Sequence, residues 1–262
     1  MKTRKLLVVH ALLTIMLLCN TAIAGQSGDY TYIILTNPVT LQQEATITGY
    51  TGAGGAISIP STVDTFPVVK VGDSSFTNNK TITSVTIEPP NIKTIGGAFV
   101  GCTNLTTVNL SDNVTSIKAS AFYGCTSLSS INLDSVGIGL NAFFRCTSLT
   151  NLTLMSTRAN VSIATNAFAE SGLITVSLSA GVTGIGYRAF SRCFNLTSIT
   201  VAPDNVRFYS LDGVLYDRNN NSLLAYPAGK ADTDFSIPNG ITTLENSSFN
   251  GSRNLEGISD SV

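Results

Sequence analysis

Charge is the scarcest feature of this chain: Asp, Glu, Lys and Arg make up 12% of its 262 residues, and tryptophan is absent. Globular proteins carry roughly a quarter charged residues, so we predict a surface that is polar but weakly charged. A nucleic-acid-binding protein usually shows a basic patch or stripe. The sequence shows none, and its formal net charge is −1. The composition therefore argues against DNA or RNA as a partner.

Long apolar runs are also scarce, and the one present lies at the N-terminus. Leu6 to Leu18 is mostly apolar, follows three basic residues and leads into the small residues of Ala22 to Gly25. This order predicts a signal peptide spanning residues 1–24, cleaved after Ala24. The run is too short for a comfortable membrane span, and no second one follows. We therefore expect an exported chain, secreted or at the cell surface, without a transmembrane span after cleavage.

Histidine occurs once, as His10, within the predicted signal peptide. Cleavage would also remove three of the 15 Lys and Arg and none of the 16 Asp and Glu, leaving a net charge of −4. Without histidine, neither Ser-His nor Cys-His nucleophilic catalysis is available. The chain has no Gly-rich phosphate loop, and its carboxylates share no local motif. We predict no enzyme activity, no cofactor and no metal site.

One short motif recurs through most of the chain. A phenylalanine that follows Ala or Ser is itself followed by L-x-x-V-x-L or a close variant, whose alternation predicts a short half-buried strand. A second apolar group, such as Val114 and Ile117, comes four to seven residues later. The phenylalanines are spaced by 23, 23, 21, 25 and 22 residues: Phe76, Phe99, Phe122, Phe143, Phe168 and Phe190. Such a period indicates stacked units that share one core.

This pattern resembles the BspA-like, or treponemal-type, leucine-rich repeat, roughly A-F-x-x-C-x-x-L-x-x-V-x-L-P-x-x-V-x-x-I-x-x. The proline after the strand is mostly replaced by Ser, Asp or Met. The resemblance implies an α/β-type repeat solenoid, mostly β, with parallel strands on one face and short irregular or turn segments on the other. We expect an N-terminal β cap over residues 25–55. The solenoid would follow over 56–262, with a β-hairpin insertion at about 205–234.

The last residues begin a further repeat with Leu255 and Ile258, but Asp260 occupies the third apolar position. A solenoid needs a polar cap over its last unit. This ending fits either a makeshift cap or a fragment of a longer protein, and both alternatives stay open.

Four cysteines occupy the same repeat position, three residues after the phenylalanine: Cys102, Cys125, Cys146 and Cys193. An even number of cysteines in an exported chain favours disulfides. Equivalent positions in neighbouring units stack in a column, however, and a small buried thiol suits such a site. We predict free thiols, with one or more disulfides as the alternative. Zinc is disfavoured because C-x-x-C and histidine are missing.

The predicted insertion contains two further candidate features. The stretch Asp217 to Asn221 is similar to the start of a calcium loop, but Ser222 and Ala228 replace the required Gly and Glu. We therefore predict an ordinary hairpin turn there. Four aromatic residues of the insertion are either partner-binding anchors or the packing side of the hairpin: Phe208, Tyr209, Tyr216 and Tyr226.

The polar positions of the strands would form two rows along one face, all Ser, Thr or Asn. The first row is Ser84, Thr107, Ser130, Asn151, Thr175 and Ser198, and the second is Thr86, Asn109, Asn132, Thr153, Ser177 and Thr200. Repeat proteins commonly bind partners across such a face. Ordinary solvated strand residues are the favoured explanation of any single position, whereas the array as a whole fits either interpretation. The face lacks Trp, Tyr and Arg, so contact would be weak or multivalent.

The resemblance implies adhesion to host matrix proteins or to other cell surfaces. The leading interpretation is a secreted or cell-surface leucine-rich repeat protein that mediates protein–protein interaction or adhesion without catalysis. The alternatives are a carbohydrate-binding or carbohydrate-active protein on a solenoid scaffold, and a truncated structural repeat fragment. The sequence does not indicate an oligomeric state.

Overall fold

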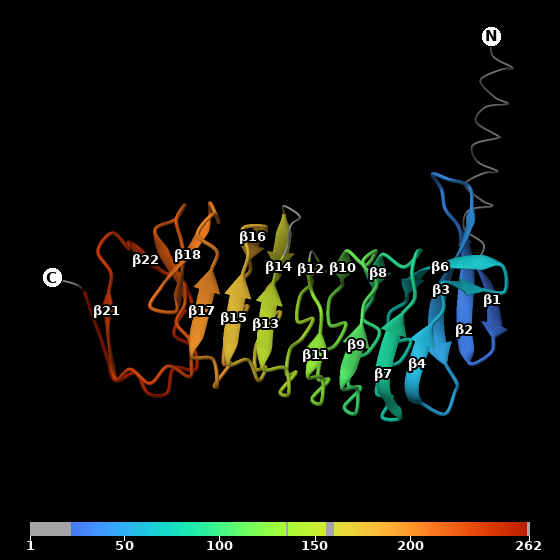
Figure 1. The fold of residues 1–262 in the computed structure, drawn as a ribbon, viewed down its shortest axis with the longest axis horizontal. Helices are drawn as coiled ribbons and strands as arrows, with labels where there is room; N and C mark the ends of the chain where they lie inside the picture. The colour runs from blue at the N-terminus through green and yellow to red at the C-terminus, as the bar shows by residue number, and fades with distance from the viewer. Residues whose placement is uncertain (1–21, 135, 156–159, 261–262) are drawn as a thin grey trace, which may run out of the picture.

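The computed structural model describes residues 22–134, 136–155 and 160–260. These residues form an elongated solenoid whose coils stack along one axis (Figure 1). Within them the regular secondary structure is entirely strand, and no helix is long and apolar enough to cross a membrane. The predicted signal peptide, with His10, lies outside the described residues except for Ala22, Ile23 and Ala24.

The predicted L-x-x-V-x-L strands form the first face of the solenoid and run parallel, as expected. They hydrogen-bond in two groups, β4 to β11 and β13 to β17, with a break between β11 and β13. Their bounds are β4 Gly55–Ile59, β7 Ile82–Ile87, β9 Thr107–Asn109, β11 Ser130–Ile131, β13 Asn151–Leu154, β15 Thr175–Leu178 and β17 Ser198–Val201. The predicted parallel sheet is confirmed, and the break between β11 and β13 is a feature that the sequence did not predict.

The second apolar group of each unit forms a second parallel sheet, where the resemblance implied turns and irregular segments. From β8 to β16 these apolar groups form strands of two to four residues, whereas β3 and β6 have eight and six residues. The strands of this sheet are β3 Gln43–Tyr50, β6 Phe66–Val71, β8 Thr94–Ile95, β10 Ser116–Ile117, β12 Gly137–Ile138, β14 Val161–Ile163 and β16 Val182–Ile185. The short strand β5, Thr62–Val63, pairs with β6.

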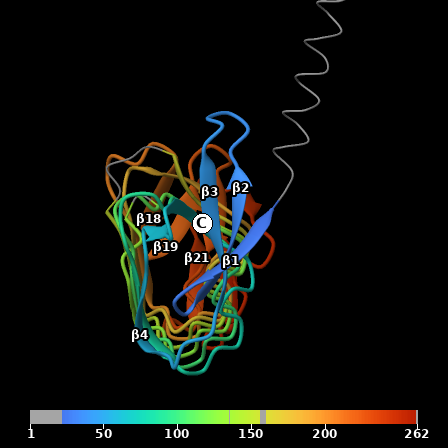
Figure 2. The same cartoon turned by 90° about the vertical axis from the view of Figure 1, so that its right-hand side faces the viewer.

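Besides the short β5–β6 pair, antiparallel strands occur at two places in the described residues. At the N-terminal end, β1 Ile23–Ser27 and β2 Tyr30–Thr36 extend the second sheet beyond β3. Figure 2, which looks along the solenoid, shows these strands across its end. Farther along, β18 Phe208–Leu211, β19 Val214–Asp217 and β20 Ser222–Ala225 form an antiparallel meander. The coil then resumes with β21 Asp234–Ile237, β22 Thr243–Leu244 and β23 Gly257–Asp260.

The repeated phenylalanines stack face to face along the solenoid axis. Ring centroids of consecutive units lie 4.8 to 6.0 Å apart with interplanar angles of 0° to 12°. Backbone hydrogen bonds join the same turns, as from Phe122 N to Ala142 O at 2.8 Å and from Phe143 N to Ala167 O at 2.7 Å. All of these rings are buried. The interval between rings matches the spacing of neighbouring strands, about 4.8 Å.

Two positions of each turn require a left-handed backbone. In most units the residue two before the phenylalanine has a φ between 53° and 66°, and the residue two after it has a φ between 57° and 98°. The first set is Ser74, Ser120, Asn141, Asn166, Arg188 and Ser247. The second set is Asn78, Gly101, Gly124, Arg145, Glu170, Arg192 and Gly251. Gly and Asn adopt this region most easily, so the Arg and Glu residues at these positions are unfavourable for the backbone conformation.

Removing one ring from the stack should weaken the whole solenoid. Phe143 lies between Phe122 and Phe168, at centroid distances of 5.3 and 5.1 Å. Because the neighbouring coils cannot close the gap, we expect Phe143→Ala to lower the free energy of unfolding by about 3–5 kcal/mol in urea titrations. The adjacent Phe144 is half-buried and stacks on one ring, that of Tyr123, so Phe144→Ala should lower the free energy of unfolding by about 1 kcal/mol. Equal losses for the two variants would contradict the stacked core.

Candidate functional site

The twelve predicted face residues lie side by side in two rows, and all are exposed or half-buried. Strand register aligns the first row, because Thr107 pairs with Ser84 and Ser130, and Thr175 pairs with Asn151 and Ser198. In the second row Asn109 pairs with Thr86, and Ser177 pairs with Thr153 and Thr200, while Asn132 lies one residue beyond the end of β11. The geometry therefore brings together the residues that the sequence grouped, and they are called the polar face below.

Neighbouring side chains of the polar face hydrogen-bond along the rows. Thr175 Oγ1 donates to Asn151 Oδ1 at 3.0 Å, and Thr200 Oγ1 donates to Ser177 Oγ at 3.1 Å. Hydroxyl and amide groups have more than one donor or acceptor site, so these bonds leave capacity for a ligand. The arrangement suits many weak polar contacts with a partner, because neither row contains a charge or an aromatic ring.

A shallow cavity of about 320 Å³ opens in the polar face where the first sheet breaks, between β11 and β13. Asn132 and Thr153 line it, together with Asp134 and Met155. Asp134 Oδ1 accepts a hydrogen bond from Met155 N at 2.7 Å, and Met155 is 67% exposed. The sequence analysis missed this cavity. Its signal was the uneven spacing of 21 and 25 residues on either side of Phe143.

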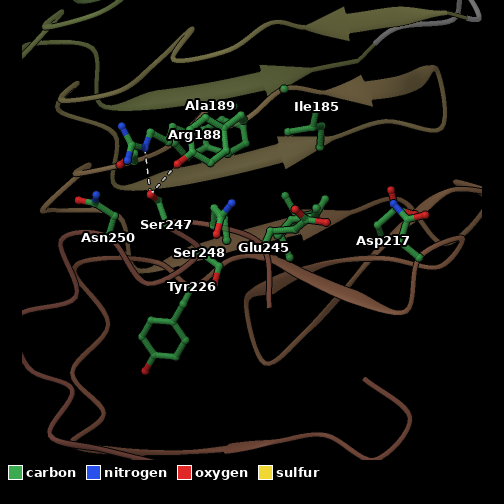
Figure 3. A pocket seen from close by; sticks show the side chains of 18 of the residues that line it. Ile185, Arg188, Ala189, Asp217, Tyr226, Glu245, Ser247, Ser248 and Asn250 are labelled. Carbon is green, nitrogen blue, oxygen red and sulfur yellow. Dashed lines mark hydrogen bonds between the residues drawn. The ribbon is translucent and has the colours of Figure 1, made fainter. Parts of the chain in front are cut away.

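A second cavity, of about 180 Å³, lies between the coil of Phe190 and the coil of Phe249 (Figure 3). The meander enters the chain between these coils and disturbs their stacking. Ser247 Oγ accepts a hydrogen bond from Arg188 Nε at 2.9 Å and contacts Tyr187 Oη at 3.1 Å. The Ser248 carbonyl accepts from Tyr226 N. Side chains thus form part of the hydrogen bonding between these two coils, whereas backbone groups form it between the other coils.

The second cavity contains two carboxylate residues, which the carbohydrate-active alternative would need. Asp217 is buried, and its carboxylate accepts hydrogen bonds from Arg207 Nε at 3.2 Å and from Asn219 N at 2.8 Å. It is therefore held by an ion pair and by the hairpin turn. Glu245 is half-buried and lies apart from it in the cavity lining (Figure 3). In a hydrolytic carboxyl pair both groups face the substrate. The Asp217 carboxylate instead faces Arg207 and the backbone of Asn219.

The aromatic residues of the meander mainly pack inward. Phe208, Tyr216 and Tyr226 are buried, and Tyr209 stacks on Tyr216 at 5.0 Å. The interpretation of these rings as the packing side of the hairpin is confirmed, and the interpretation as exposed anchors is wrong. The segment that is similar to a calcium loop is the turn between β19 and β20.

The four cysteines that the structure describes are all free and buried, as predicted. Each thiol donates to the carbonyl oxygen of the preceding unit's phenylalanine, at 3.0 to 3.2 Å. Burial raises the pKa of Cys102 and of Cys193 to about 11. Within the described chain, no three His, Cys, Asp or Glu side chains gather into a metal-binding group.

Comparison with known proteins identifies the repeats. The family model described as BspA type leucine rich repeat region, with six copies, matches residues 135–211. A leucine rich cell surface protein from Faecalibacterium prausnitzii A2-165 is 31% identical, with a TM-score of 0.64, over 92% of this chain and 73% of that one. No curated protein matches the chain.

Two other solved structures share the fold. The pneumococcal vaccine antigen PcpA is 25% identical with a TM-score of 0.74, over 90% of this chain and 64% of that one. A leucine-rich repeat protein from Eubacterium ventriosum is 24% identical with a TM-score of 0.65, over 92% and 60%. The chain therefore spans less than two thirds of the length of these two proteins.

The buried thiols should stay protected from alkylation until the solenoid unfolds. We expect iodoacetamide at pH 8 to leave Cys102, Cys125, Cys146 and Cys193 unmodified in buffer and to modify all four in concentrated urea, as read by peptide mass mapping. Equal modification in both conditions would contradict thiols buried in the core.

The raised thiol pKa values also set a pH dependence. Thiols of the unfolded chain ionise above about pH 8.5. Cys102 and Cys193 stay protonated in the folded chain up to about pH 11. Their contribution to stability is therefore complete below about pH 8.5 and falls as the pH rises towards 11. The melting temperature of Cys102→Ala/Cys193→Ala should therefore decrease less between pH 8.5 and pH 11 than that of the wild type.

Proposed function

Because the chain belongs to the BspA-type leucine-rich repeat family, we propose that it is a secreted or cell-surface protein that binds a protein partner and has no catalysis of its own. The relative from Faecalibacterium prausnitzii is a cell surface protein by its own description. A solenoid suits this role because it presents a long rigid surface without requiring a deep pocket. The partner is a host matrix protein or a component of another cell surface.

The polar face is the surface that we assign to this contact. The observation that carries the assignment is the strand register, which aligns eleven of the twelve Ser, Thr and Asn side chains in two groups of three coils on either side of the break between β11 and β13. An extended partner can cross several coils and form one or two hydrogen bonds with each. The cavity between β11 and β13 would hold one apolar side chain of the partner against Met155, and Asp134 would favour a neighbouring cation. The rest of the contact would be neutral and individually weak.

Export supports the same function. Residues 1–24 are the proposed signal peptide, and its last two residues, Ile23 and Ala24, begin β1, which with β2 crosses the N-terminal end of the second sheet. Paired strands at that end cover the edge of the first parallel strand, where unpaired backbone groups would otherwise attract other chains. We assign residues 25–55 to this cap, 56–262 to the solenoid and about 205–234 to its insertion.

A binding screen tests this assignment. The protein would be applied to immobilised fibronectin and fibrinogen and to a glycan array, beside the variant Asn109→Arg/Asn132→Arg/Thr153→Arg. These three residues are exposed members of the second row. Bulky charged side chains there should weaken binding to a protein target at least tenfold, about 1.4 kcal/mol.

The matched control carries three arginines on the other side of the solenoid, as Asn113→Arg/Thr115→Arg/Ser162→Arg, at positions that are equally exposed. It should bind like the wild type, and circular dichroism would verify the folding of both variants. Equal loss in both variants would reject the polar face as the site. Binding to glycans alone would favour the carbohydrate-binding alternative, and no binding by a folded wild type would argue against adhesion by this chain.

A further inference from the structure

Three arginines and two aromatic rings form a continuous line along the edge of the solenoid where the phenylalanine turns lie. Arg145 Nε contacts Glu170 Oε2 at 2.8 Å, and Arg192 contacts the other oxygen of Glu170 at 3.5 Å. Arg192 and Arg253 then lie over the ring of Phe194, at 5.7 and 3.7 Å from its centroid. Arg145 also lies over Phe144, at 5.3 Å. These residues are called the arginine row below.

The arginine row occupies positions that other repeats fill with small residues. Arg145, Glu170 and Arg192 take the left-handed position, with φ of 57° to 60°, where three other units have glycine. A non-glycine residue in this conformation is strained, and such residues cluster at functional sites. Arg253 likewise takes the position where earlier units have threonine, as at Thr126 and Thr147. The turn itself therefore does not require these side chains.

The guanidinium groups of the row keep most of their hydrogen-bonding capacity. The side chains of Arg145 and Arg192 are 57% and 53% exposed. In the structure Arg145 uses Nε and Arg192 uses one terminal nitrogen, both towards Glu170. Glu170, the only acid of the row, is shared between two arginines, so the row carries an excess of positive charge. Stacking on aromatic rings fixes the planes of the guanidinium groups without occupying their donors.

We propose that the arginine row binds an anionic polysaccharide through its sulfate or carboxylate groups. Arginine forks bind such planar or tetrahedral anions with paired hydrogen bonds. The row runs along the solenoid axis, across the coils of Phe143, Phe168, Phe190 and Phe249, so it matches a linear polymer with repeated charges. A protein partner would need an apolar core to its interface, whereas the row offers cations on half-covered rings. This site differs from the polar face in location and in partner.

Heparin, which is sulfated, and hyaluronan, which carries carboxylates alone, are the two probes. The test variant is Arg145→Gly/Arg192→Gly/Arg253→Thr, which gives each position the residue of an equivalent repeat. Because glycine adopts the left-handed backbone freely, the melting temperature of the test variant should equal or exceed that of the wild type. We expect at least a tenfold loss of affinity for the bound polysaccharide at low salt, measured by surface plasmon resonance. Addition of salt should weaken the wild-type interaction steeply.

The matched control removes three positive charges elsewhere, as Lys80→Gln/Lys93→Gln/Lys118→Gln, at exposed positions. It should retain wild-type affinity within about twofold. If the test variant melts early, Arg145→Gln/Arg192→Gln/Arg253→Gln gives the same readout. Binding to heparin alone assigns the site to sulfate, and binding to both probes assigns it to anionic glycans in general. No binding to either probe, equal binding by the test variant, equal loss in the control, or tighter binding to poly-glutamate would overturn the proposal.

Discussion

The stacking of one phenylalanine on the next is the constraint on which the rest of the structure depends. Ring centroids 4.8 to 6.0 Å apart fix the rise of each coil, and backbone hydrogen bonds between the same turns hold that rise. A strand on either side of the core can pair with its neighbour only if every coil keeps this rise. The buried thiols obey the same rule, because each one bonds to the carbonyl of the phenylalanine one coil earlier. The sequence therefore repeats because every coil must keep the same rise along the solenoid axis.

Two of the cavities lie where the repeat period changes. Units of 21 and 25 residues on either side of Phe143 interrupt the first sheet between β11 and β13, and the shallow cavity of the polar face opens there. The meander separates Phe190 from Phe249 by 59 residues, and the smaller cavity lies between their coils. In both places backbone hydrogen bonds still join the phenylalanine turns of the neighbouring coils, as from Phe122 N to Ala142 O and from Arg192 N to Asn250 O. A changed unit length is therefore one source of concave features in this solenoid, beside a cavity over the strands β13, β15 and β17.

The period, the apolar pattern and the polar alternation were enough to predict the shared core, the parallel strands, the buried cysteines and the alignment of Ser84 with Thr107 and Ser130. These features depend on contacts between equivalent positions, which a repeat makes explicit. The second sheet was not predicted, because two apolar residues do not distinguish a two-residue strand from a turn. The arginine row was not predicted either. Its contact between Arg145 and Glu170 depends on the left-handed turn, which only the replacement of a repeated glycine could have signalled.

The two proposed surfaces would place different functions on one scaffold without altering its core. Residues of the polar face project from strands, where β propensity and solubility already favour Thr, Ser and Asn, so selection for binding and selection for folding coincide there. The arginine row is the opposite case. At its left-handed positions folding favours glycine, and Arg145 and Arg192 are present despite that preference. A residue that opposes the local requirement of the fold is better evidence for function than one that satisfies it. On this criterion the row carries more information about binding than the larger and more regular face.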